Sequence, residues 1–399
     1  MWKGIALGTA LAGLSAFALS ADAQRGGQPQ DPFNGQWGVM ETVLSPEAAA
    51  DDVSRMADAL AKLPPQRPGI VDTYVLSASF WNEPVFENEA KEAAAILGRR
   101  FDATDRTIVL SLGRGPTLAR TLPIATPNNF NAALGRIGKI IDPKEDLVVV
   151  FFTSHGSPDG AVALQEKGRM AGALRALQLR TALQQSNIKT KLVIVSACFS
   201  GHFIMPFSDP DTMVLTAAAA DKTSFGCEPS RDWTYFGDAL FNHAMRGGEP
   251  VLQAFVAARD IITKWEGTLH DNWAALSPAQ RQQQAEPQPS NPQQNSGDNA
   301  LAVIAKAESY GNAVSCAGHL SFALDRARTG RPLKGLTDIA ALTSAQSAAQ
   351  NRATTEGTAR GRSSQDTAKA VVQAATTALQ LYPAQTTNIV ANATSCMAP

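Results

Sequence analysis

The sequence is poor in the features that mark several common classes of protein. Its 35 Lys and Arg residues nearly balance 36 Asp and Glu residues, which leaves a formal net charge of −1. Such a balance gives no basis for binding nucleic acid or an anionic membrane surface. No cysteine–histidine cluster has the spacing of a zinc site, and no glycine-rich segment matches a nucleotide-binding fingerprint. We therefore expect no metal ion, nucleotide or other cofactor.

Long apolar segments are missing except at the N-terminus. There, residues 4–19 form an apolar run behind Lys3, and residues 21–23 (Ala-Asp-Ala) fit the small-x-small rule for signal-peptide cleavage. We expect a signal peptide over residues 1–23, cleaved near Ala23, and a periplasmic or secreted protein that has no membrane anchor after cleavage. The alternative is an uncleaved N-terminal anchor, although the run is short for a membrane span.

Cysteines are few, and export would place them where disulfides form. Pairing all four of them would allow three connectivities. We expect one disulfide, between Cys316 and Cys396, because both lie in the C-terminal region and Cys198 has another use.

What the chain does contain is an alternation of strands and helices. Its 399 residues, 44% of them apolar, are enough for one large domain and an appendage. Strands are predicted at residues 71–80, 107–112, 146–153, 191–197 and 212–220, and helices at 46–62, 87–98, 128–141, 170–186, 233–246 and 250–265. The third and fourth strands are uninterrupted apolar runs, which are typical of a parallel sheet covered on both faces. The alternation predicts an α/β fold with a mainly parallel sheet between two layers of helices.

The two ends of the chain differ from this alternating region. Residues 24–69 are expected to form an N-terminal extension with one helix, and the main domain covers residues 70–305. Within that domain, residues 276–299 are rich in Gln, Pro and Asn and are expected to be irregular. Residues 306–399 have helical periodicity and are expected to form a helical C-terminal appendage.

A histidine and a cysteine follow two of the predicted strands. His155 and Gly156 follow the third strand, and Cys198 follows the fourth. One crossover separates these strands, so we expect them to be neighbours about 4.8 Å apart, with both side chains at the same edge of the sheet. A nearby imidazole activates a thiol and protonates a leaving amine. We expect the backbone N–H groups of Gly156 and Cys198 to hold an oxyanion, while His202 is an alternative partner for the thiol.

Four ordered segments resemble the caspase–legumain clan of cysteine peptidases, and in particular the bacterial members of peptidase family C13. They are FFTSHGSPDG, VIVSACFSGHF, AAADKTSFGCE and RDWTYFGDALF, and the similarity covers roughly residues 70–305. The interval from His to Cys is close to the roughly 50 residues of the caspase signature, whereas SACFSG departs from the caspase pentapeptide. The resemblance implies a caspase-like three-layer α/β/α sandwich, with Cys198 as the nucleophile and His155 as the catalytic histidine.

The resemblance also implies a pocket for the side chain that precedes the scissile bond. Asp238 falls where legumain has an acidic residue at the pocket floor; the alternative for it is a cap or an ion pair within its own helix. Ser196 stands where legumain has a Glu two residues before its cysteine, so strict asparagine specificity is not expected. Cys227 is either a wall of the cleft or a structural thiol. Asn82 is the nearest counterpart of an Asn that orients the legumain histidine, but its local sequence does not match.

Together, these residues predict an exported cysteine endopeptidase that acts on peptide or protein substrates through an acyl-enzyme. Release of the acyl group by an amine instead of water would make the protein a transpeptidase. The alternative from another class is a catalytically silent, caspase-like binding or scaffold protein of the periplasm. A further hypothesis is that the helical C-terminal region covers the cleft. The sequence leaves the oligomeric state open.

Overall fold

The structure is a computed structural model that describes residues 40–41, 44–114 and 120–397. The expected signal peptide and most of the extension that follows it lie outside the described residues. Within the described ranges, no helix is both long enough and apolar enough to cross a membrane.

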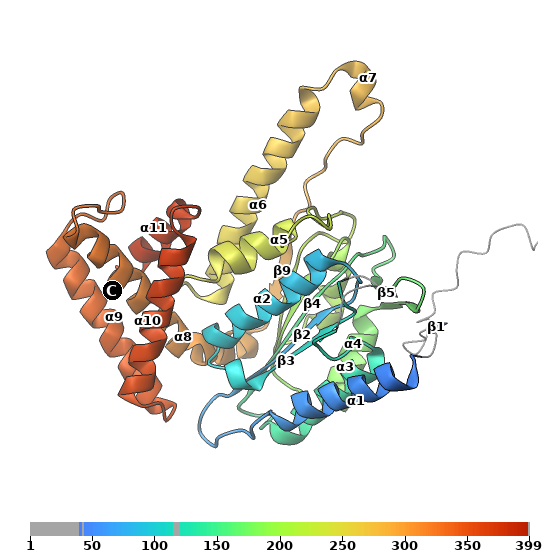
Figure 1. The fold of residues 1–399 in the computed structure, drawn as a ribbon, viewed down its shortest axis with the longest axis horizontal. Helices are drawn as coiled ribbons and strands as arrows, with labels where there is room; N and C mark the ends of the chain where they lie inside the picture. The colour runs from blue at the N-terminus through green and yellow to red at the C-terminus, as the bar shows by residue number, and fades with distance from the viewer. Residues whose placement is uncertain (1–39, 42–43, 115–119, 398–399) are drawn as a thin grey trace, which may run out of the picture.

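A six-stranded sheet forms the centre of the described chain, with the strand order β3-β2-β4-β7-β8-β9 (Figure 1). Its strands are β2 (Thr73–Ser79), β3 (Thr107–Ser111), β4 (Leu147–Thr153), β7 (Lys191–Ser196), β8 (Thr212–Thr216) and β9 (Gln293–Ser296). Neighbouring strands pair in parallel except β9, which runs antiparallel to β8 at the edge. The strands β2, β4, β7 and β8 are buried along their whole length, as their uninterrupted apolar sequences require.

Helices cover both faces of this sheet. On one face, Met56 of α1, Phe130 of α3 and Leu179 of α4 join the strands in one apolar core. On the other face, α2, the π-helix η5, α6 and the beginning of α8 form a second core. The bounds are α1 (Pro46–Ala61), α2 (Pro84–Arg100), α3 (Pro127–Ile140), α4 (Ala176–Gln185), α5 (Tyr235–Gly237), η5 (Asp238–Ala244), α6 (Val251–Ala274) and α8 (Asp298–Arg328). The three-layer α/β/α architecture expected of a caspase-like protein is confirmed.

A second, small antiparallel sheet contains the hairpin that comes after His155 in the chain. It consists of β1 (Met40–Glu41), β6 (Met170–Leu174) and β5 (Val162–Glu166), in that order. The helix predicted from residue 170 therefore begins six residues later, at Ala176. The reason is a tight turn at Gly168, whose φ of +77° favours glycine and folds β5 back onto β6.

The segment 276–299 is more regular than its composition predicted. It contains the short helix α7 (Pro278–Arg281) and the edge strand β9. The prediction missed β9 because its residues, QQNS, pair through their backbone and have little β propensity. The buried Glu266 of α6 accepts the backbone N–H of Ser290, which anchors the returning chain before β9.

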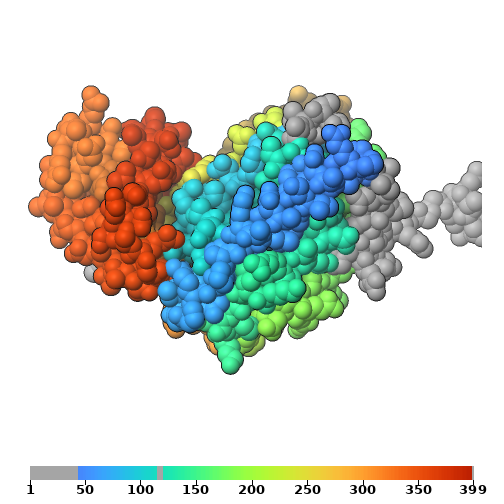
Figure 2. All heavy atoms as spheres, turned by 60° about the horizontal axis from the view of Figure 1, so that its bottom comes forward, coloured from blue at the N-terminus to red at the C-terminus, as the bar shows by residue number. Residues whose placement is uncertain are grey.

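The C-terminal helices form a lobe beside the sheet domain (Figure 2). After α8 come α9 (Ile339–Ala359), α10 (Ser364–Leu381) and α11 (Thr386–Ser395). The helix α8 is unbroken across the expected boundary at residue 305: Ile304 packs in the sheet core, whereas Leu320 packs in a separate core with α9, α10 and α11. The expected disulfide is present, and it joins Cys316 on α8 to Cys396 after α11.

Candidate active site

The candidate site lies where the neighbouring strands β4 and β7 end. Thr153 and Ser196 are paired in the parallel register, and each precedes its reactive residue by two positions. His155 and Cys198 therefore occupy equivalent places on adjacent turns, as predicted. The turns touch, because a Cβ at Gly156 would overlap the carbonyl oxygen of Cys198 and would lie 3.2 Å from its amide nitrogen. Glycine at position 156 is what allows this approach.

The imidazole of His155 sits between two aromatic side chains. Its ring centroid is 4.6 Å from that of Trp81 and 5.0 Å from that of Phe86, both in edge-to-face geometry. Burial lowers the pKa of His155, and the nearby charge of Glu83 opposes the shift. The neutral imidazole is thus favoured at neutral pH, which is the form that accepts a proton from a thiol.

The thiol of Cys198 is half-buried and lies against the segment that follows β8. Its Sγ accepts the backbone N–H of Ser224 at 3.3 Å, and it lies 3.7 Å from the hydroxyl and from the carbonyl oxygen of the same residue.

The turn after the thiol is strained. Phe199 has a φ of +57°, an unusual value for a bulky residue, and its backbone N–H bonds the carbonyl of Lys222 at 2.7 Å. Strain of this kind is concentrated at functional sites, where the surrounding structure holds it in place.

Two backbone donors lie close to the thiol. The N–H groups of Gly156 and Cys198 bond no acceptor among the described residues, whereas those of the residues that follow them, Ser157 and Phe199, are paired. Ser157, for example, donates to the carbonyl of Ala161. Free donors on touching turns are the arrangement that an oxyanion requires.

The two residues expected in the substrate pocket have different surroundings. Ser196 is buried at the end of β7, and its Oγ lies 3.1 Å from the Oγ1 of Thr234, so its hydroxyl is engaged behind the site. Asp238 begins η5 and is partly exposed, with Oδ1 2.8 Å from the amide nitrogen of Asn242 and 3.4 Å from the imidazole of His243. Burial would raise the pKa of Asp238, but these partners outweigh it and lower the pKa, which keeps the carboxylate charged.

The alternative residues are engaged elsewhere. The Nε2 of His202 lies 3.2 Å from the carbonyl oxygen of Pro158, and the amide of Asn82 donates to the carbonyl of Leu112 at 2.6 Å. Cys227 is partly exposed, yet the burial of its thiol and the nearby Cys198 raise its pKa. A thiol with a raised pKa is a poor nucleophile at neutral pH.

Sequence reasoning missed the aromatic contacts of His155 and the buried Glu89 behind the site. Trp81 offered a signal, because it follows directly after the first predicted strand and so lies at the same edge of the sheet as His155 and Cys198. Glu89 offered none, because an acidic residue within a helix is ordinarily exposed.

A caspase-like α/β/α fold with a thiol and an imidazole on adjacent strand ends defines the class of cysteine-dependent hydrolases. The model of the Peptidase C13 family matches residues 124–273, so this part of the chain is similar to that family of cysteine peptidases. The matched region includes His155, Cys198 and Asp238. No curated protein matches the chain.

Proposed function

We propose that the chain cleaves peptide bonds with Cys198 as the nucleophile and His155 as the general base and acid. The observation that carries this proposal is the in-register placement of the two residues on touching turns. The match of residues 124–273 to a cysteine peptidase family supports the same conclusion, and peptides or proteins are the substrates of that family.

The reaction follows from the surroundings of each group. Neutral His155 takes the thiol proton, and the Sγ of Cys198 attacks the peptide carbonyl carbon. The negative charge on the carbonyl oxygen is held by the N–H groups of Gly156 and Cys198, a contribution of roughly 3–4 kcal/mol per donor in other enzymes. Protonated His155 then gives its proton to the departing amine, leaving a thioester on Cys198.

Water or another amine resolves the thioester. His155 removes a proton from water, the resulting hydroxide attacks the thioester carbonyl, and the thiol leaves with the proton. An incoming amine would form a new peptide bond by the same steps. We propose hydrolysis as the main outcome, and adding a peptide amine to the assay and measuring the ligated product gives the share of transpeptidation.

Asp238 is the proposed recognition group for the side chain before the scissile bond. It is charged, partly exposed, and faces Arg231 at 3.9 Å. With Ser196 engaged behind the site, this pocket has one partly exposed acid instead of two, so we propose a preference for polar or basic side chains without strict asparagine specificity.

Export is the proposed setting of this chemistry. It is supported by the signal-peptide pattern of residues 1–23 and by the disulfide between Cys316 and Cys396, which persists in an oxidising compartment. Comparing the intact mass of the protein from periplasm and from cytoplasm tests it, because processing near Ala23 shortens only the exported form.

Cleavage of a mixed peptide library by the purified protein, with Cys198→Ala as the blank, tests the function. Products that appear only with the wild-type chain support a peptidase, and their sequences give the specificity. A library left intact by the folded, reduced wild-type protein would instead favour a non-catalytic binding role.

A further inference from the structure

Glu89 of α2 is a fully buried carboxyl group that lies directly behind the candidate dyad. Its Oε2 accepts the hydroxyl of Thr153 at 3.2 Å, and its Oε1 accepts the hydroxyl of Thr234, whose Oγ1 lies 3.1 Å from the Oγ of Ser196. Thr153 and Ser196 end β4 and β7, and each lies two positions before His155 or Cys198. One side chain is therefore linked to both strand ends that carry the proposed chemistry, directly through Thr153 and by way of Thr234 to Ser196.

Glu89 also bonds the segment that leads to Asp238. Thr234 donates its backbone N–H and its hydroxyl to Glu89, at 3.3 and 3.1 Å. A Cβ at Gly237 would overlap the same carboxyl group. Glu89 thus contacts the end of β4 and the segment that leads to Asp238, without itself reaching the surface.

A buried carboxyl group is costly to keep in a core, so its retention needs a reason. Burial raises the pKa of Glu89 to about 7, although the hydrogen bonds of Ser196, Thr234 and Thr153 oppose the rise. An apolar residue of similar size would avoid that cost but would leave the three hydroxyl groups without this partner.

We propose that Glu89 is a positioning residue that fixes the turn of His155 against the turn of Cys198. The inference rests on the proposed function, in which the two turns carry the catalytic residues His155 and Cys198. Glu89 has no exposed surface and so does not touch substrate; it acts through Thr153 and Ser196.

Three variants test this role: Glu89→Gln, Glu89→Ala and Glu266→Ala. Gln can bond the same hydroxyl groups, because hydroxyls both donate and accept. We expect Glu89→Ala to lower kcat by roughly tenfold to a hundredfold with little change in KM, as small misplacements do, and Glu89→Gln to restore most of it. Glu266, a buried carboxyl group that anchors Ser290, is the matched control, and its loss should lower stability without this fall in kcat.

The alkylation rate of Cys198 by iodoacetamide gives a readout that needs no peptidase activity. We expect it to fall in Glu89→Ala and to recover in Glu89→Gln, even if no peptide substrate is ever cleaved. If Glu89→Ala does not fold, Thr153→Ala takes its place in the test, because it removes one of the same hydrogen bonds. Equal effects of Glu89→Ala and Glu266→Ala, or no recovery with Gln, would overturn the proposal.

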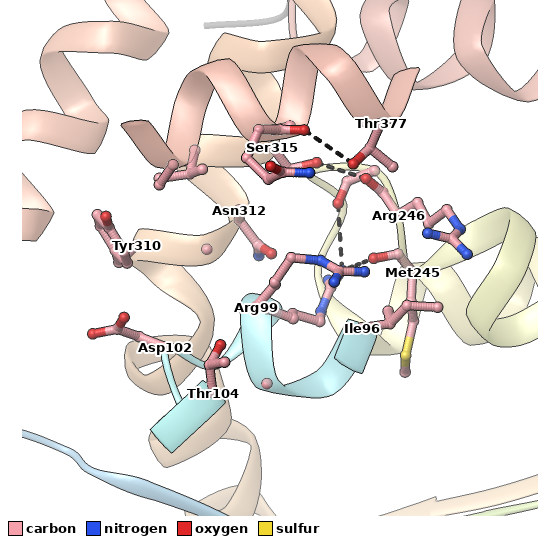
Figure 3. A pocket seen from close by; sticks show the side chains of 18 of the residues that line it. Ile96, Arg99, Asp102, Thr104, Met245, Arg246, Tyr310, Asn312, Ser315 and Thr377 are labelled. Atoms are coloured by element: carbon pink, nitrogen blue, oxygen red, sulfur yellow. Dashed lines mark hydrogen bonds between the residues drawn. The ribbon is translucent and has the colours of Figure 1, made fainter. Parts of the chain in front are cut away.

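A second feature, independent of the dyad, is a cavity of about 470 Å³ between the sheet domain and the C-terminal lobe. Figure 3 shows it enclosed by side chains from the end of α2, the turn after η5, α8 and α10. Neither His155 nor Cys198 lines it, so it is separate from the candidate active site.

Two arginines that line this cavity, the exposed Arg99 and the partly exposed Arg246, form no ion pair with a described carboxylate, although the more distant charge of Glu92 acts on both and that of Asp238 acts on Arg246. Within the described ranges, neither Arg99 nor Arg246 has a carboxylate oxygen within 4 Å, and Arg246 bonds only the neutral oxygens of Asn242. Burial and the nearby charge of Arg99 lower the pKa of Arg246, so the two cations repel one another. Arg100, by contrast, is neutralised by Glu308 at 2.9 Å.

The opposite wall of the cavity carries the apolar side chains of Val314 on α8 and of Ala370, Ala374 and Leu381 on α10, next to polar ones such as Gln373 and Thr377. Three carboxylates also line the cavity, and each has a cationic partner: Asp102 pairs with Arg362, Asp105 with Arg106 and Asp366 with Lys369. Guanidinium groups without a carboxylate partner, opposite apolar side chains, match a ligand with one anionic end and an apolar body. We propose that this cavity binds a small organic carboxylate, with its charge on Arg99 and Arg246 and its apolar part against α10.

Titration of the purified full chain with octanoate tests this site, with octanol and inorganic phosphate as comparisons. We expect calorimetric binding of octanoate that is weakened at least about tenfold in Arg246→Gln and in Arg99→Gln. Arg259→Gln, an exposed arginine on α6, is the matched control and should bind as the wild type does. Absence of octanoate binding, equal binding by the cavity variants, or tighter binding of octanol or phosphate would overturn the proposal.

Discussion

The edge of the sheet and the junction with the C-terminal lobe both contain buried polar groups, but they use them differently. At the junction, the buried groups Arg100 and Asp102 are paired: Arg100 bonds Glu308, and Arg362 bonds Asp102. At the sheet edge, the backbone donors of Gly156 and Cys198 are left without acceptors among the described residues. Paired polar groups hold parts of a protein together, whereas unpaired groups beside a reactive side chain are ready to bind a substrate.

Replacing the two histidines near Cys198 gives the largest expected effect at the sheet edge. We expect His155→Ala to lower kcat/KM by roughly a thousandfold or more, because the thiol loses its base and the amine loses its acid. His202→Ala should stay within about threefold, since its imidazole bonds Pro158. Peptide cleavage at equal concentrations of folded protein measures both effects. A larger loss in His202→Ala than in His155→Ala would make His202 the partner of the thiol.

Breaking a buried ion pair at the junction should alter stability and leave the chemistry intact. Glu308→Ala leaves the guanidinium of Arg100 buried and uncompensated, so we expect a loss of about 3–5 kcal/mol in the free energy of unfolding. The exposed Glu47 is the control, and Glu47→Ala should change that free energy by about 0.5 kcal/mol or less. Urea unfolding measures both, and a loss of kcat in folded Glu308→Ala would contradict the separation of the two regions.

Removing the disulfide should have a somewhat smaller effect, confined to the lobe. Cys316 and Cys396 are 80 residues apart, and closing a loop of this size contributes roughly 2–4 kcal/mol. We expect the Cys316→Ala/Cys396→Ala variant to unfold its lobe at lower urea while cleaving peptides at the wild-type rate. Cys227→Ala, which removes an unpaired thiol, is the control for the loss of sulfur alone.

The strands β4 and β7 were easier to predict than β9 and the hairpin of β5 and β6, because the sequence signals of β4 and β7 are local. The apolar runs that become β4 and β7 end two residues before His155 and Cys198, so the same segments predict both the strands and the reactive residues. The strand β9 has no apolar signal, and the hairpin of β5 and β6 depends on the turn at Gly168. Backbone pairing with a strand that is distant in sequence fixes β9, and a tight turn fixes the hairpin; hydrophobic periodicity reveals neither.

The sequence predicted the reactive residues of the candidate site but not the residues that position them. His155, Gly156 and Cys198 stand at strand ends, where parallel sheets place functional groups. Glu89 becomes a neighbour of the site only when α2 packs across the sheet. Sequence spacing therefore predicts what reacts, while tertiary packing decides what positions it.

The smallest expected effect concerns pH. Because burial lowers the pKa of His155, its imidazole stays neutral at lower pH than usual, and the acid limb of kcat/KM should have its midpoint below about 6.5. Trp81→Ala exposes the ring and should move that midpoint upward, whereas Glu83→Gln removes a charge that raises the pKa and should move it downward. A wild-type midpoint above 6.5 would contradict the role of the aromatic contacts.

Covalent labelling of the reduced, full-length protein by a peptidyl acyloxymethyl ketone tests the central claim most directly. Mass spectrometry of the digested product locates the adduct and compares the wild type with His155→Ala and Cys227→Ala. The account predicts one adduct, on Cys198, formed quickly in the wild type and in Cys227→Ala and much more slowly in His155→Ala. An unlabelled Cys198 in the folded wild-type protein, or labelling that does not depend on His155, would contradict it.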